Sequence, residues 1–360
     1  MLRVARFLHG FARHPRSGVL EEEITVPMAD GEIPATLYRP DTRRAMPGWL
    51  VLHGITVPGR RHPMLERFAH SLAAAGGVVI IPEIRPWQQL RMEPDAADAI
   101  IAAAAHALVQ RPDVMPGGIS LVGFSFGATQ ALITAAHDAE RHEIRSVVGF
   151  GGYCDLKRTL TFQMTGEHEW KGSVYHLDPD PYGRWIVAAN YLSRTPGYEA
   201  MTAVSEAAGE LAAEAGRRGV YAADPLFDPL KSDLRKRLSG DEVEVWDLIA
   251  PPSARRPDPA RARELAAALV ETALQVHPVL DPRPLLPDLN RRLVLAHGRA
   301  DHLIPFTETL RLRACLPTRA PVDTFITRLF AHSTESRGFP AHQYPLEIAR
   351  YLRLLQRALG

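Results

Sequence analysis

The sequence has few cysteines and no excess of charge of either sign. Cys154 and Cys315 are its only cysteines, and neither belongs to a Cys-x-x-Cys pair. We therefore expect neither a disulfide framework nor a zinc site built from thiolates. The formal net charge is +1 over 360 residues. Charge this close to neutral gives no electrostatic reason to expect nucleic acid as a partner.

Long hydrophobic runs are also absent. No stretch approaches the apolar length that crosses a bilayer, so we expect no integral membrane segment. Residues 1–16 mix apolar side chains with arginines, and they lack the continuous apolar core and cleavage site of a secretory signal. This pattern predicts a short amphipathic helix that docks on the folded body, with weak association with a membrane surface as the alternative. The expected location is the cytoplasm.

Two common ligand-binding motifs are missing as well. The His-Glu-x-x-His pattern of zinc proteases does not occur, because Glu167-His168-Glu169 has no second histidine four residues away. The Gly-x-Gly-x-x-Gly pattern of dinucleotide-binding folds is absent too. We expect no metal and no cofactor.

Much of the chain alternates between apolar strand-like runs and helical patterns, which predicts an α/β fold. Several of these runs are continuously apolar, as in strands that are covered on both faces. The fold class is therefore a mostly parallel central sheet with helices on both faces. The predicted strands are residues 20–26, 32–38, 49–53, 78–81, 146–151, 292–296 and 322–329, together with an apolar run that begins at residue 119 and leads into Gly123.

The alternation stops in the middle of the chain. Residues 156–286 are helical and polar in pattern, and they contain no continuous apolar strand run. We interpret 1–155 and 287–360 as one core domain, and 156–286 as a helical lid or cap inserted into it.

Residues 119–127 contain the pattern of a nucleophile elbow, Gly123-Phe124-Ser125-Phe126-Gly127. A buried strand precedes it and a helical pattern follows it, as this motif requires. The sharp turn forces the serine to the tip, and the two glycines leave room for neighbouring elements to approach closely. The sequence therefore predicts Ser125 as a nucleophile.

A serine nucleophile needs a base, and the base needs a carboxylate that orients it. Asp301 follows the predicted strand 292–296, and His332 follows the predicted strand 322–329. The chain order Ser125, Asp301, His332 is the order found in α/β-hydrolases.

With these motifs the sequence resembles the α/β-hydrolase superfamily over nearly the whole chain outside the insertion. Four motifs occur in the family's order: a strand ending in His53-Gly54, the Gly-x-Ser-x-Gly elbow, the His-Gly-x-x-Asp-x-x-x-Pro run at 297–305, and the late His332. The resemblance implies an oxyanion hole formed by the backbone N–H groups of Phe126 and Ile55, although the loop after Gly54 could present a neighbouring amide instead.

The resemblance also leaves some roles open. Some members of the family take their acid from the end of the preceding strand, where this chain has Asp155, although the Asp-x-x-x-Pro context favours Asp301. We interpret His297 as a structural histidine and His53 as a brace of the oxyanion loop. Substrate-binding residues are unknown from the sequence. The insertion offers candidates that line a pocket, with packing of the lid on the core as the alternative for most of them: Tyr182, Trp185, Ile186, Tyr191 and Leu192.

The predicted function is a serine hydrolase that cleaves a small-molecule carboxylic ester through an acyl-enzyme on Ser125. Amide or peptide cleavage and acyl transfer would use the same three residues and stay open. A non-catalytic binding protein with this fold is a further alternative, but such a role gives no reason to retain all three. The sequence does not indicate the substrate or the oligomeric state.

Overall fold

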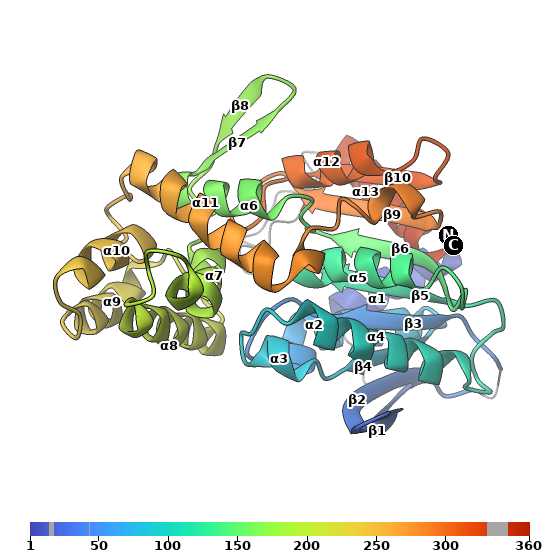
Figure 1. The fold of residues 1–360 in the computed structure, drawn as a ribbon. Helices are drawn as coiled ribbons and strands as arrows, with labels where there is room; N and C mark the ends of the chain where they lie inside the picture. Colours follow the sequence, from blue (N-terminus) through green and yellow to red (C-terminus); the bar gives the residue numbers. More distant parts are fainter. Residues whose placement is uncertain (14–17, 43, 330–344) are drawn as a thin grey trace.

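The computed structural model describes residues 1–13, 18–42, 44–329 and 345–360. Its centre is an eight-stranded sheet in the order β1-β2-β4-β3-β5-β6-β9-β10. Strand β2 is antiparallel to both of its neighbours, β1 and β4, and the other pairings are parallel. The predicted fold class is confirmed (Figure 1). The strands are β1 (Val19–Met28), β2 (Gly31–Pro40), β3 (Gly48–Leu52), β4 (Val78–Pro82), β5 (Ile119–Phe124), β6 (Ile144–Phe150), β9 (Arg292–Gly298) and β10 (Val322–Thr327).

Helices cover both faces of the sheet because side chains along each strand alternate between two apolar layers. On one face, residues such as Val51 and Val122 pack against one group of helices, and on the other face Leu50 and Leu121 pack against a second group. The first group comprises α1 (Leu2–Arg13), α2 (Pro63–Ala74) and α13 (Pro345–Leu359). The second comprises α4 (Pro94–Val109), α5 (Phe126–His137) and α12 (Thr307–Cys315), and the short α3 (Arg85–Gln88) follows β4.

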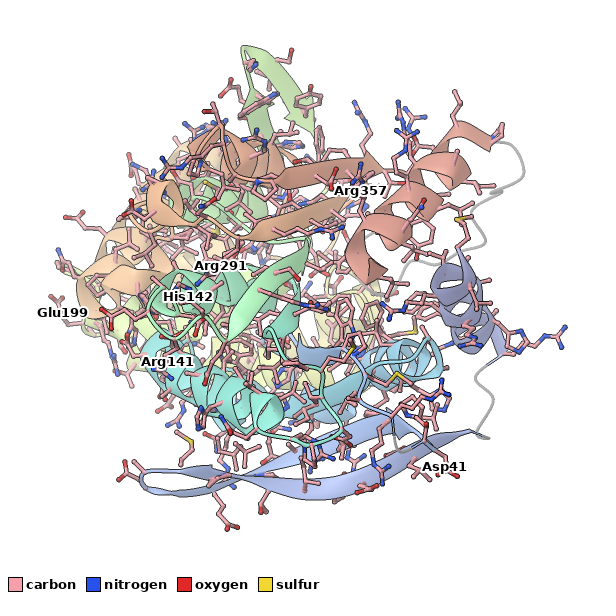
Figure 2. The ribbon with its side chains drawn as sticks, turned by 90° about the vertical axis from the view of Figure 1, so that its right-hand side faces the viewer. Asp41, Arg141, His142, Glu199, Arg291 and Arg357 are labelled. Carbon is pink, nitrogen blue, oxygen red and sulfur yellow. The ribbon has the colours of Figure 1, made fainter. Side chains whose placement is uncertain are left out.

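The N-terminal helix docks on the body, as its amphipathic pattern predicted. Val4 and Phe7 are almost fully buried, and they belong to the same apolar layer as α2 and α13. Figure 2 views the molecule from the right-hand side of Figure 1 and shows α1 near α13, which carries Arg357. Within the described ranges, no helix is both long and apolar enough to cross a membrane.

The segment between β6 and β9, which we call the cap, adds no strand to the central sheet. It projects beyond the carboxyl ends of the parallel strands (Figure 1). Its helices are α6 (Leu156–Thr165), α7 (Tyr182–Tyr191), α8 (Thr202–Arg218), α9 (Asp228–Arg235), α10 (Asp241–Ile249) and α11 (Pro259–Val276).

The cap also contains a two-stranded hairpin, which the sequence reading of a purely helical insertion missed. Its strands are β7 (Glu167–Trp170) and β8 (Ser173–His176). Lys171 and Gly172 connect them, and both have positive φ, at 50° and 80°. Two consecutive residues with positive φ form the tight turn that suits the twist of a hairpin.

Candidate active site

Ser125 lies at the sharp turn between β5 and α5. Its backbone has φ 56° and ψ −127°, a conformation that residues other than glycine rarely adopt. The turn is held on one side by the Ser125 N–H, which donates to the carbonyl of Phe150 at 2.7 Å. A hydroxyl at this position is presented at the carboxyl edge of the sheet, because β5 ends one residue before it.

The two glycines of the elbow are required by close backbone contacts. A Cβ on Gly123 would lie 2.2 Å from the carbonyl oxygen of Gly127. A Cβ on Gly127 would lie 2.3 Å from the carbonyl oxygen of His53. Both distances are far below van der Waals contact, so the predicted close approach of neighbouring elements is confirmed.

The loop after β3 passes directly over the serine. A Cβ on Gly54 would lie 3.2 Å from the Ser125 Cβ and 3.6 Å from its Oγ. The next residue, Ile55, is buried. Phe126 is the first residue of α5, and N–H groups in the first turn of a helix have no acceptor within the helix. The two backbone segments expected to stabilise an oxyanion therefore both adjoin Ser125.

His53 has the environment of a neutral, structural imidazole. Its Nδ1 lies 2.6 Å from the carbonyl oxygen of Gly54, which can only accept, so Nδ1 carries the proton. Burial lowers the pKa of His53 to about 4. Its ring packs edge-on against Trp87, which packs in the same way against Phe126. These contacts agree with the interpretation of His53 as a brace for the loop.

Asp301 follows β9 and is 2% exposed. Its Oδ1 accepts from the N–H groups of Leu303 and Ile304, both at 2.9 Å. Its Oδ2 lies 3.2 Å from Nε2 of His297. The N–H groups of Leu303 and Ile304 thus fix the orientation of this carboxylate at the edge of the sheet.

His297 is fully buried beside this carboxylate. Its Nε2 lies 2.8 Å from the carbonyl oxygen of Ile304, so Nε2 carries a proton. Its Nδ1 lies 2.7 Å from Oγ1 of Thr309, and the threonine hydroxyl can donate to it. The predicted structural role of His297 agrees with these bonds.

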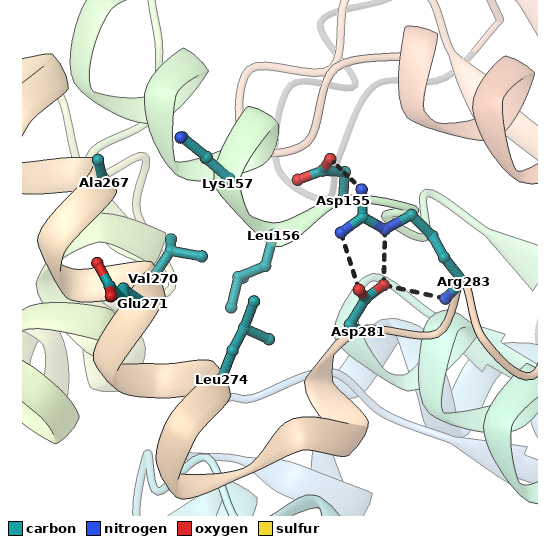
Figure 3. A pocket seen from close by; sticks show the side chains of 9 residues that line it. All are labelled: Asp155, Leu156, Lys157, Ala267, Val270, Glu271, Leu274, Asp281 and Arg283. Carbon is teal, nitrogen blue, oxygen red and sulfur yellow. Dashed lines mark hydrogen bonds and ion pairs between the residues drawn. The ribbon is translucent and has the colours of Figure 1, made fainter.

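Asp155, the alternative acid, makes other interactions at the start of the cap. It is the N-cap of α6, where its Oδ1 accepts from the N–H of Arg158 at 3.2 Å. Its Oδ2 lies 2.8 Å from Nη1 of Arg283, which also pairs with Asp281 (Figure 3).

These charged residues border a pocket of about 360 Å³ between α6 and α11. Ser125 and Asp301 are not among the residues that line it, so Asp155 faces a different space. The residues lining the pocket are Asp155, Leu156, Lys157, Ala267, Val270, Glu271, Leu274, Asp281 and Arg283.

His332, the predicted base, lies outside the described residues. The strand before it, β10, ends at Thr327, which pairs with Gly298 of β9 in a parallel register. The carboxyl ends of β9 and β10 therefore lie at one edge of the sheet. Asp301 follows β9 at that same edge.

The cap residues expected to line a pocket separate into two kinds. Trp185, Ile186, Tyr191 and Leu192 are at most 5% exposed and belong to the apolar core, so they pack the cap. Tyr182 differs, because its hydroxyl reaches the loop after β3 and donates to the carbonyl oxygen of Ile55 at 3.4 Å. The sequence gives no local signal for this contact between residues 127 positions apart.

Within the part of the chain that the structure describes, no group of three or more His, Cys, Asp or Glu side chains could hold a metal ion.

No protein-family model and no curated protein sequence matches the chain. Solved structures do match. An esterase from Pyrobaculum calidifontis is similar, with 18% identity and a TM-score of 0.50 over 99% of this chain and 88% of the esterase. The acylaminoacyl peptidase of Pyrococcus horikoshii is similar, with 12% identity and a TM-score of 0.52 over 98% of this chain.

The chain spans only 43% of the length of that peptidase. At such low identity these likenesses concern the fold alone. The protein has the α/β-hydrolase fold, as its motifs predicted.

Proposed function

We propose that the protein is a serine hydrolase that cleaves a carboxylic ester through an acyl-enzyme on Ser125. The observation that carries the proposal is the strained backbone of Ser125 beside the Gly54–Ile55 loop, at the sheet edge where Asp301 is held. A strained backbone conformation that the surrounding structure holds in place is typical of a nucleophile at a strand-to-helix turn.

In the proposed mechanism His332 takes the proton from Ser125 as the hydroxyl attacks the acyl carbon. It then delivers that proton to the leaving alcohol. Asp301 selects the imidazole tautomer and stabilises the imidazolium. The N–H groups of Phe126 and Ile55 donate to the oxyanion of the tetrahedral intermediate. Water then attacks the acyl-enzyme by the same route and releases the acid.

We also propose that the inserted segment 156–286 acts as a lid over this site. Supporting this, Tyr182 contacts the loop that carries Ile55, and the N–H of Asp180 donates to the carbonyl of His302 at 2.7 Å. A lid in this position would exclude water and shape the substrate pocket.

A cytoplasmic location is part of the proposal, and the free thiols of Cys154 and Cys315 agree with a reducing compartment.

A fluorophosphonate probe tests the nucleophile directly. We expect the parent protein to be labelled, Ser125→Ala to be unlabelled, and Ser120→Ala to be labelled like the parent. Ser120 is the matched control because it lies on the same strand, where its hydroxyl bonds to that of Ser146 inside the sheet. A parent that stays unlabelled would point instead to a binding protein with this fold.

A panel of chromogenic substrates tests the bond that is cleaved. We expect turnover of p-nitrophenyl esters, with rates that depend on acyl length, and a loss of at least about 10⁴-fold in Ser125→Ala. Anilides with the same acyl groups serve as the amide comparison. Faster turnover of the anilides would contradict ester specificity and favour amide or peptide cleavage.

A further inference from the structure

Tyr182, the first residue of α7, connects the cap to the oxyanion loop. Its hydroxyl donates to the carbonyl oxygen of Ile55 at 3.4 Å. Its own N–H donates to Oδ1 of Asp180 at 2.9 Å, which fixes the start of the helix. Burial raises the pKa of the Tyr182 hydroxyl, so it remains a protonated donor at neutral pH.

The segment just before Tyr182 is bonded to the loop that carries Asp301. The N–H of Asp180 donates to the carbonyl of His302 at 2.7 Å, and Nδ1 of His302 lies 2.6 Å from the carbonyl oxygen of Asp178. Residues 178–182 therefore contact two core loops at once. One loop holds the proposed acid, and the other holds the proposed oxyanion donor.

Helix α8 supports the same loop from the cap side. A Cβ on Gly216 would lie 2.8 Å from Cγ2 of Val57 and 3.1 Å from the Tyr182 hydroxyl oxygen. The absence of a side chain at this position lets the helix, the tyrosine and the loop meet. Gly209 on the same helix is different, because a Cβ there would only reach Ala189 at an ordinary 3.5 Å.

We propose that Tyr182 is a positioning residue, whose hydroxyl holds the Ile55 carbonyl so that the Ile55 N–H stays directed at the oxyanion above Ser125. This inference rests on the proposed function, since it assigns a role within that reaction. The loop runs from Gly54 past the serine and has no regular secondary structure of its own between residues 53 and 58. Because an oxyanion donor must be held within a fraction of an ångström, a fixed carbonyl on the same residue improves its alignment.

The first test compares Tyr182→Phe with Tyr191→Phe. Tyr191 lies on the same helix, and its hydroxyl also donates to a core carbonyl, that of Met92 at 3.1 Å. We expect Tyr182→Phe to lower kcat about 10-fold with KM changed less than about 2-fold, and Tyr191→Phe to leave both near the parent values. Equal loss in the two variants would overturn the proposal in favour of a general effect of cap packing.

A transition-state analogue separates alignment from folding. An alkyl trifluoromethyl ketone forms a tetrahedral adduct on a serine, so its inhibition constant reports on oxyanion stabilisation. In Tyr182→Phe we expect this constant to rise by the same factor by which kcat/KM falls. An unchanged constant beside a lowered kcat would contradict the positioning role.

Gly216→Ala and Gly209→Ala form a second pair on α8. The added methyl in Gly216→Ala must displace Val57, so we expect a fall in kcat of about 10-fold or more and faster amide exchange at residues 55–57. We expect Gly209→Ala to match the parent. Parental kcat and exchange in Gly216→Ala would count against the proposal.

Amide exchange at residues 55–57 also distinguishes failure of the positioning role from failure of the proposed function. If the parent is not labelled by fluorophosphonate, the proposed function fails, and with it the catalytic role of Tyr182. If the parent is labelled and active, unchanged exchange in Tyr182→Phe overturns the positioning role alone.

Discussion

Ser125 holds a backbone conformation with positive φ that costs about 1–3 kcal/mol for a residue other than glycine. The surrounding structure must offset this cost, and it does so with close packing. Gly123 and Gly127 bring the start of α5 and the end of β3 into backbone contact around the serine. At the scale of single residues, the absence of side chains at Gly123 and Gly127 therefore allows the packing that holds Ser125 in its strained conformation.

Replacement of Asp301 by asparagine should lower kcat, whereas the same replacement of Asp155 should not. Asp301→Asn keeps the shape but removes the charge, so we expect kcat to fall about 10³- to 10⁴-fold, since a neutral amide no longer stabilises the imidazolium. Asp155→Asn keeps an oxygen that caps α6 but removes the ion pair with Arg283, so we expect parental kcat and a stability loss of at most about 1 kcal/mol. Steady-state kinetics and urea unfolding measure both effects. A large loss of kcat in Asp155→Asn alone would assign the acid to Asp155.

At the scale of elements, the junction between β6 and the cap is held by a side chain from α12. Glu308 is 1% exposed, and its Oε2 accepts from the N–H of Cys154 at 3.0 Å and of Asp155 at 2.8 Å. These two N–H groups lie where the chain leaves the sheet, and no strand continues there to pair with them. The carboxylate supplies the acceptor that the backbone would otherwise lack.

Replacement of Glu308 should test this anchoring. Glu308→Ala leaves two buried N–H groups without an acceptor, so we expect it to lower the free energy of unfolding by about 2–4 kcal/mol. Glu308→Gln retains an acceptor oxygen of the same reach and should cost less than about 1.5 kcal/mol. Chemical denaturation of the three proteins at one pH provides the comparison. Equal stability of the alanine and glutamine variants would show that these bonds contribute little.

A strand or helix can be predicted from the sequence when the residues that determine it lie within the element itself. Strands β3, β4 and β5 were predictable because each is a continuous apolar run that the sheet buries on both faces. The β7–β8 hairpin was missed because its four-residue strands are polar and its Lys171-Gly172 turn lacks the usual Asn-Gly signal. The roles expected for Asp301 and Ser125 followed from ordered motifs. The contact between Tyr182 and Ile55 did not, because it joins two distant segments through packing.

At the scale of the whole molecule, two apolar layers enclose one sheet, and the cap is joined to the same core. The layer containing α4 and α5 continues into the cap through residues such as Trp185 and Leu211. The opposite layer is completed by the two ends of the chain, where α1 packs beside α13. Because cap and core share one apolar cluster, a change in a buried group near the sheet edge should affect the stability of the entire fold.

His53 is such a group, and it should make global stability depend on pH. Burial lowers its pKa from 6.5 to about 4 in the folded protein, so folding favours the neutral ring. Its contribution is fully present above pH 6.5 and is lost as the pH falls from 6.5 toward 4. By linkage, we expect His53 to remove about 2 kcal/mol of unfolding free energy between pH 7 and pH 5.

Urea unfolding of the parent and of His53→Asn at pH 7, 6 and 5 measures this effect. Asparagine can place an N–H near the position of Nδ1 and still donate to the Gly54 carbonyl, but it does not titrate. The variant should therefore lose less stability than the parent on acidification, by about 2 kcal/mol at pH 5. His9→Asn serves as the control, because His9 lies exposed on α1 and should leave the parental pH dependence unchanged. Parallel pH profiles for the parent and His53→Asn would mean that His53 titrates normally, and that its burial at the end of β3 does not exclude the charged ring.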